Sequence, residues 1–428
     1  MPVLNRFEAP IITDPVDYTL TLQPYQFFSL DNGVPVYSIH AGTQDVIQVE
    51  WVFDAGNWQE DKRLVAAATN FLLKNGTASN NAFSINQQFE FYGAFLSMQC
   101  HVETASITLF CLSKYACKLI PLVADILTNS IFPENELETF KQIQKQKLQV
   151  NLQKCDFVAN RVIDSYLYGY AHPYGAVSSL EAYDALDRTD LETFYKTFYL
   201  NGFCRIFISG LIPHDMEMLL NESFGKMPLN QKKLPEKGYT QFCEKEKKHR
   251  VINDEKSVQA AVRLARKFPN KHHPDYIKAT VLNNILGGFF GSRLMSNIRE
   301  EKGYTYGIYS YFKNYVAESE WIISTEAGRD VSEATVYEIY KELEKLKNEP
   351  VGKDELYLVR NQIIGGILSH LDGPFEIMSR WKSYILNGLD ENYFNQSIEI
   401  IKTISAKEIQ DLANKYFSTG SFYELTVI

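Results

Sequence analysis

The chain has 428 residues, of which 45% are hydrophobic and 22% charged, a composition typical of a folded protein with two or three domains. Its net charge of −9 argues against nucleic-acid binding, which depends on a basic surface. No run reaches the roughly 18 apolar residues of a membrane span, and the acidic, proline-containing start does not resemble a signal peptide. We therefore expect a cytoplasmic protein without a membrane partner.

The first half of the sequence predicts an alternation of strands and helices. The turn Asp31-Asn32-Gly33 separates two strands of a hairpin, and Pro35 places the second strand at a sheet edge or begins it. Apolar residues on alternate positions predict a strand at 46–53. The other predicted elements are helices at 64–73, 86–92, 117–131, 190–199 and 216–224, a long helix from 133 that breaks near 156, a hairpin of 95–101 with 106–112, and a strand at 205–210.

The second half of the sequence repeats this order. Residues 227–249 are polar, highly charged and contain Pro and Gly, which indicates a linker between a first domain at 1–226 and a second at 250–428. The repeated elements are strands at 257–268 and 320–327, helices at 276–286 and 331–346, and a long helix from 354. The segments 193–210 and 411–428 align without a gap at a shift of 218 residues. This self-similarity predicts a duplicated α+β unit.

The stretch 286–312 combines three features within a short length of chain. It begins with a glycine-rich loop at Gly287 and Gly288, continues as a short helix, and reaches a stop signal at Gly303. Tyrosines then alternate as in a strand, at positions 304, 306, 309 and 311. The glycine loop lacks the Lys and Ser/Thr of a phosphate-binding loop. We therefore interpret the stretch as a site for an extended peptide.

Four local sequences carry a resemblance to a known family: NFLLKNGT at 70–77, HPYG at 172–175, SRLMSNIREEKGYTYG at 292–307, and the similar ends of the two halves. With them the chain resembles the pitrilysin/insulinase class of zinc metallopeptidases, whose zinc helix carries the inverted motif H-x-x-E-H. It is most similar to the short bacterial and mitochondrial-processing-type members. The resemblance implies an α+β fold of two homologous halves, each an antiparallel-rich sheet covered by helices, like LuxS and the processing peptidases.

The zinc motif is missing from its expected place. Counted back from Gly76-Thr77, the first His, the Glu and the second His of the family motif fall on Ala67, Asn70 and Phe71. Ala and Phe cannot bind zinc, and Asn cannot take a proton from bound water. The family's third ligand is a Glu on the long helix that follows, but no Asp or Glu occurs between Glu138 and Asp156. We expect no metal bound by this chain.

A second family motif is retained. In the family, the second half supplies an Arg and a Tyr that hold the substrate and stabilise the oxyanion of the tetrahedral intermediate. These positions correspond to Arg299 and Tyr306, with Tyr304 as an alternative to the second. The resemblance and the glycines further imply a peptide-facing loop at 287–290, which consists of Gly287, Gly288, Phe289 and Phe290. The strand at 95–101 corresponds to the edge strand along which the family aligns its substrates.

The sequence thus predicts a non-catalytic, substrate-binding subunit of a heterodimeric zinc peptidase. Its partner would be a homologous catalytic chain that keeps H-x-x-E-H and binds the zinc, and peptides would be the substrates. Two alternatives stay open at this stage. The chain could be a structural or assembly protein of the same fold without a proteolytic role, or an independent metallopeptidase with unrecognised ligands.

Overall fold

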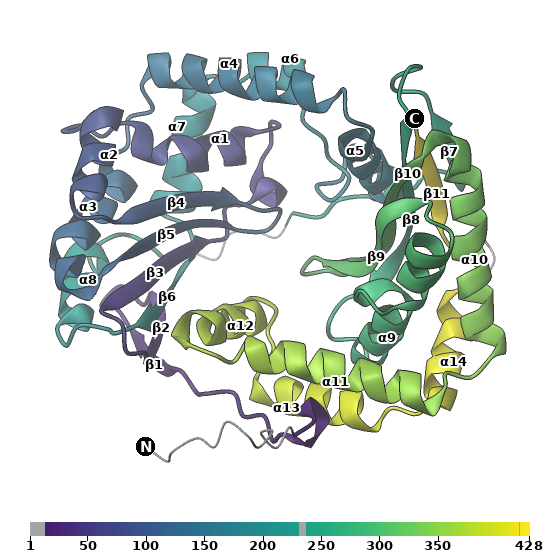
Figure 1. Ribbon diagram of the computed structural model, residues 1–428. Helices are drawn as coiled ribbons and strands as arrows, with labels where there is room; N and C mark the ends of the chain where they lie inside the picture. Colours follow the sequence, from purple (N-terminus) through teal and green to yellow (C-terminus); the bar gives the residue numbers. More distant parts are fainter. Residues whose placement is uncertain (1–12, 231–236, 419) are drawn as a thin grey trace.

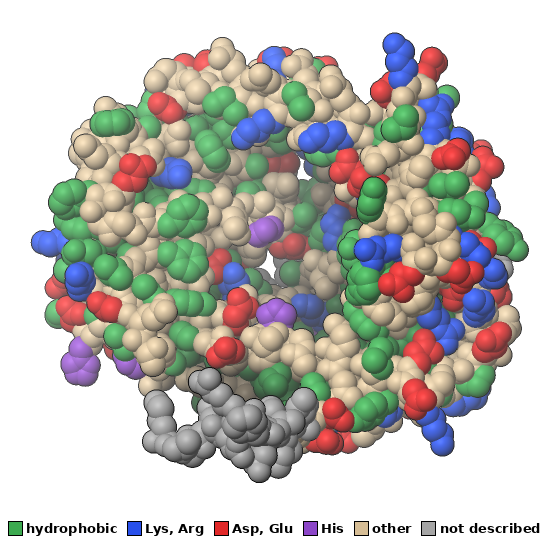
Figure 2. Space-filling model, in the orientation of Figure 1, with side chains coloured by type: hydrophobic (Ala, Val, Ile, Leu, Met, Phe, Trp, Pro, Cys, Tyr) green, Lys and Arg blue, Asp and Glu red, His purple; other side chains and the backbone are tan. Residues whose placement is uncertain are grey.

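The computed structural model describes residues 13–230, 237–418 and 420–428. The first residues of the predicted N-terminal domain and residues 231–236 of the predicted linker therefore lie outside the described part of the chain. Figure 1 shows two β-sheets on opposite sides of a ring, which α4 and α5 close at the top and α11, α12 and α13 close at the bottom. In the space-filling view the centre of this ring is hollow (Figure 2).

The first sheet has six strands in the order β1-β2-β6-β3-β5-β4. Its strands are β1 (Gln26–Ser29), β2 (Pro35–His40), β3 (Val46–Phe53), β4 (Phe95–Cys100), β5 (Ala105–Leu112) and β6 (Cys204–Gly210). Within the described strands of this sheet, β2 and β6 pair in parallel and the other neighbours are antiparallel. The helices of this half are α1 (Val65–Leu72), α2 (Ala82–Phe91), α3 (Ala116–Asn129), α6 (Leu180–Asp184), α7 (Arg188–Tyr195) and α8 (Met216–Phe224).

The second sheet has five strands in the order β7-β11-β8-β10-β9. They are β7 (Lys248–Val251), β8 (Gln259–Pro269), β9 (Thr305–Asn314), β10 (Glu318–Gly328) and β11 (Tyr423–Val427). The helices of this half are α9 (Tyr276–Asn283), α10 (Ser332–Asn348), α11 (Lys353–Ser369), α12 (Pro374–Leu386), α13 (Glu391–Thr403) and α14 (Ala406–Tyr416). The predicted fold class, two homologous α+β halves with antiparallel-rich sheets covered by helices, is confirmed.

One helix of each half crosses to the sheet of the other half. The long helical stretch divides into α4 (Glu134–Asn151) and α5 (Cys155–Tyr168), and the apolar face of α5, with Ala159 and Ile163, packs against Ala265 and Leu425 of the second sheet. The equivalent helix α12, about 218 residues later, packs against the first sheet, where Lys382 bonds to Glu50 of β3 at 2.7 Å. Each half therefore completes the core of the other.

Local sequence signals account for many of the element boundaries. Pro35 is the first residue of β2 and Gly33 turns the hairpin with φ of +82°, as its Asn-Gly turn predicts. The long helix breaks at 152–154, slightly before the predicted position. The helices α6, α12, α13 and α14 were not predicted from the sequence. No helix in the described part of the chain is long and apolar enough to cross a bilayer.

Candidate functional site

The three positions of the lost zinc motif lie on α1. Ala67 is half-buried and has no side chain that could bind a metal. Asn70 is buried, and its amide donates hydrogen bonds to the carbonyl of Ser106 at 3.3 Å and the hydroxyl of Tyr199 at 3.1 Å. The ring of Phe71 lies 5.2 Å from that of Phe140 on α4. At the positions of the zinc motif, the side chains thus make core hydrogen bonds (Asn70) and an aromatic contact (Phe71).

The same conclusion holds for the rest of the described chain. Across residues 13–230, 237–418 and 420–428, no three His, Cys, Asp or Glu side chains cluster in a way that could hold a metal ion. The residues present on α1 and α4 do not fit zinc, since metal sites need three or four donor side chains at about 2 Å from the ion.

The first sheet presents a free edge beside α1. Within the described residues, β4 pairs with β5 alone and forms the outermost strand. Helix α1 packs against β4. Phe95 at the start of β4 is 63% exposed. Unpaired backbone groups at such an edge can pair with an extended peptide.

The glycine loop lies in a π-helical turn, Asn284–Gly288, that ends α9. Gly287 is buried, and a Cβ at this position would lie 2.8 Å from the backbone nitrogen of Ser310 on β9. Phe289 packs against the core of the second half, whereas Gly288 is exposed and Phe290 is 57% exposed. Of the four loop residues that the sequence placed against a peptide, Gly287 and Phe289 thus serve packing, and only Phe290 lines the groove described below.

Arg299 lies in the last turn of a short π-helical segment, Met295–Glu301. Its guanidinium carbon is 4.4 Å from the centre of the Phe290 ring, a cation–π contact. Gly303 follows with φ of +68°, a left-handed conformation that ends helices. The backbone then enters β9, so the bend brings Arg299 and the tyrosine strand to the same groove.

A β-bulge directs Tyr306 into solvent. In the pairing of β9 with β10, Thr305 lies opposite Ala327 and Ile308 lies opposite Thr325, so Tyr306 and Gly307 together face Glu326 alone. Bulges of this kind re-aim side chains and are common near functional sites. Tyr306 is 94% exposed, whereas Tyr304 is half-buried against the core. Of the two tyrosines considered, Tyr306 is the one free to reach a ligand.

These residues line an open groove of about 1030 Å³ on the second half. Arg299, Tyr304 and Tyr306 occur together in its wall with Phe290. The sequence did not point to the carboxylates that also line it, which come from Glu300, Glu326 and Asp330. A guanidinium and a phenol are hydrogen-bond donors suited to a peptide carbonyl or to the oxyanion derived from it.

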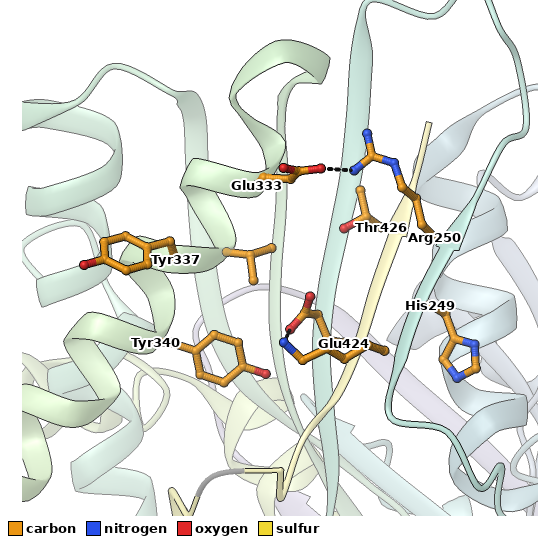
Figure 3. A pocket seen from close by; sticks show the side chains of 9 residues that line it. His249, Arg250, Glu333, Tyr337, Tyr340, Glu424 and Thr426 are labelled. Atoms are coloured by element: carbon orange, nitrogen blue, oxygen red, sulfur yellow. Dashed lines mark hydrogen bonds and ion pairs between the residues drawn. The ribbon is translucent and has the colours of Figure 1, made fainter.

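A second cleft, of about 470 Å³, lies between α10 and the strands β7 and β11 (Figure 3). Its charged groups are paired with one another: Arg250 bonds to Glu333 at 3.0 Å, and Lys248 lies 3.3 Å from Glu424. Burial and the neighbouring Glu424 carboxylate raise the pKa of the Tyr340 phenol, which is therefore neutral. The two ion pairs thus occupy the charged side chains named here, while the Tyr337 phenol in the same cleft is 67% exposed.

Comparison with known proteins places this geometry in context. Residues 185–363 match the family model "Peptidase M16 inactive domain". The chain is 27% identical over 385 residues to "Non-peptidase homolog YmxG" of Helicobacter pylori, covering 85% of this chain and 84% of that protein. It is 23% identical over 357 residues to "Uncharacterized zinc protease YmxG" of Bacillus subtilis, covering 82% and 85%. A crystal structure of a peptidase M16 inactive domain from Pseudomonas fluorescens shares the fold with a TM-score of 0.84 at 22% identity, covering 94% and 98%.

Proposed function

We propose that the chain is a member of the pitrilysin/insulinase (M16) peptidase family, whose inactive-type domain model its residues 185–363 match, and that it is the substrate-binding subunit of a heterodimeric zinc peptidase. Its partner would be a homologous chain with an intact H-x-x-E-H motif. The complex would degrade or process peptides. Alone, this chain would hold peptides without cleaving them.

One contrast within the chain carries the proposal. On α1, the motif positions hold Ala67, the hydrogen-bonded Asn70 and Phe71, which leaves no metal-binding donor set. On the second half, Tyr306 is 94% exposed and shares a groove with Arg299. A side chain this exposed makes almost no contact that could stabilise the isolated chain. Its position in the bulge at the start of β9 therefore favours a role in binding.

The partner would supply the metal and the general base, and this chain would supply orientation and hydrogen bonds. Arg299 would donate from its guanidinium to the oxygen of the scissile carbonyl, while the Phe290 ring beneath it limits the rotamers that it samples. The Tyr306 hydroxyl would donate to the same oxygen or to a neighbouring peptide group. The free edge of β4 would add main-chain pairing that tolerates many sequences.

The test is peptide cleavage by each chain and by the co-expressed pair. Replacing Arg299 by Ala in the mixed complex is expected to lower kcat by about ten- to a thousandfold, as the loss of one oxyanion donor does. Tyr306→Phe should lower kcat in the same direction. The matched control is Tyr309→Phe on the same strand, which is 53% exposed and should leave the rate unchanged. Full turnover with both Arg299→Ala and Tyr306→Phe would show that the assigned roles are wrong.

A structural or assembly role is the second candidate. The cation–π contact between Arg299 and Phe290, together with the exposed Tyr306, would also suit packing against a partner surface. In that case no complex of this chain would cleave peptides, and no neighbouring reading frame would encode a homologue with H-x-x-E-H. Stoichiometric zinc in the purified chain, with chelator-sensitive cleavage, would instead favour an independent metallopeptidase.

A further inference from the structure

One face of α4 is in contact with neighbouring residues along its first half and exposed along its second half. Positions 136, 140, 143, 147 and 150 lie on one face, since they are spaced by three and four residues. At the first two positions the strip is occupied: Glu136 accepts a hydrogen bond from Asn75 at 2.8 Å, and Phe140 packs against Phe71. Beyond them Ile143 is 46% exposed, Lys147 is exposed and Val150 is 52% exposed. We call Phe71, Ile143, Lys147 and Val150 the α4 strip.

The α4 strip lies where the family's zinc site would be. Phe71 occupies a ligand position of the degenerate motif, and the strip continues from its contact with Phe140. Figure 1 shows that α4 runs along the top of the ring and that its C-terminal end leads into α5. In the same orientation, Lys and Arg side chains stand at the upper edge of the central opening (Figure 2). The exposed half of the strip continues the face of α4 that meets α1 through the contact of Phe140 with Phe71.

The α4 segment that carries the strip is positively charged, whereas the whole chain is negatively charged. The protein carries a net charge of −9, yet no Asp or Glu occurs from 139 to 155, and the lysines of that segment are Lys141, Lys145, Lys147 and Lys154. Two of them are neutralised locally: Lys141 pairs with Glu138 at 2.7 Å and Lys145 with Asp184 at 2.5 Å. Lys147, on the strip itself, forms no ion pair within the described part of the chain. An uncompensated cation thus lies between exposed apolar side chains.

We propose that the α4 strip binds an acidic peptide segment that also carries apolar side chains. The free Lys147 ammonium would pair with a carboxylate of the peptide, while Phe71, Ile143 and Val150 would cover its apolar groups. Since α1 packs against the edge strand β4, a peptide paired with that edge would run beside the strip. The assignment rests on the proposed substrate-binding role and adds to it the class of substrate.

The test is fluorescence anisotropy of the full chain with three short labelled peptides. One peptide alternates Leu with Glu, the second has Gln in place of every Glu, and the third has Lys. We expect the acidic peptide to bind about two- to fivefold more tightly than the Gln peptide, the effect of one exposed ion pair, with an affinity that falls as salt is added. Lys147→Glu should weaken the acidic peptide about tenfold and strengthen the Lys peptide. Ile143→Ser should weaken all three peptides.

The control is Lys118→Glu, which makes the same charge change at an exposed lysine of α3 and should leave binding unchanged. Equal binding of the three peptides, no binding of any, or equal effects of Lys118→Glu and Lys147→Glu would overturn the proposal. Self-association that Ile143→Ser abolishes, without peptide binding, would assign the strip to an interface between copies instead. The helper-subunit role fails separately, when Arg299→Ala leaves the cleavage of an uncharged peptide by the mixed complex intact.

Discussion

A buried carboxyl group at the junction of the two halves gives the most quantitative prediction. Glu320 on β10 has no exposed surface, and neither of its carboxylate oxygens has a hydrogen-bond partner. Lys313 Nζ lies 3.9 Å away but is 2.5 Å from Asp164 of α5, the helix that crosses from the first half. Burial, and then repulsion from Asp164, raise the pKa of Glu320 to about 8. Glu320 is therefore mostly protonated at neutral pH.

This pKa fixes the sign of a pH dependence. In the unfolded chain Glu320 ionises near pH 4.5, its ordinary value. Between about pH 4.5 and 8 the folded state binds a proton that the unfolded state has released, so stability falls as pH rises through this window. The slope for one such group is about 1.4 kcal/mol per pH unit. Burial also raises the pKa of Asp164, which acts in the same direction.

Glu320→Gln removes the titration while it keeps the size and neutrality of the side chain. Relative to its value at low pH, the stability advantage of the variant over the wild type is expected to be within about 1 kcal/mol near pH 5 and roughly 3 kcal/mol of unfolding free energy near pH 7, with the difference growing up to pH 8. Urea unfolding followed by circular dichroism at pH 5, 6, 7 and 8 measures this difference. The control is Glu399→Gln at an exposed position of α13. Parallel pH profiles for the wild type and Glu320→Gln would refute the reasoning.

Two further substitutions test packing around the site. Gly287→Ala should destabilise the fold by about 2 kcal/mol in urea unfolding, since its Cβ would lie 2.8 Å from the backbone of Ser310. The control is Gly366→Ala, which has open space around it and should be neutral or stabilising by up to about 1 kcal/mol. Equal effects of the two substitutions would contradict the close contact at Gly287. Tyr174→Phe removes the hydroxyl that donates to Glu103 at 2.8 Å and accepts from the backbone of Ala317 at 3.3 Å. It should cost about 1–3 kcal/mol and speed hydrogen exchange at the β9–β10 turn, and unchanged exchange there would show that the bond does not join the halves.

The sequence predicted much of the candidate site because that information is local. Loss of the zinc motif follows from the residue types at Ala67, Asn70 and Phe71, and no fold could turn Ala or Phe into a ligand. The hairpin turns and the helix stop at Gly303 depend on neighbouring residues, so the pattern indicated them correctly. The proximity of Arg299 and Tyr306 also followed from one short bend.

Other properties depended on residues far apart in the chain. The bulge that exposes Tyr306 exists only in the pairing of β9 with β10, and a run of alternating tyrosines does not reveal it. Gly287 and Phe289 looked like loop residues available to a peptide, but contact with β9 and the core of the second half occupies them. Their roles depend on how the loop packs.

The sequence by itself determined the duplication, the α+β class and the missing metal ligands, since periodicity, turn residues and donor atoms are properties of short segments. Tertiary structure alone decided that α5 packs on the second sheet and α12 on the first, and that Glu320 is buried beside Asp164. These features depend on contacts across more than a hundred residues of chain. Such contacts depend on which apolar faces of helices and sheets pack together in the folded chain, and a short sequence pattern does not specify this.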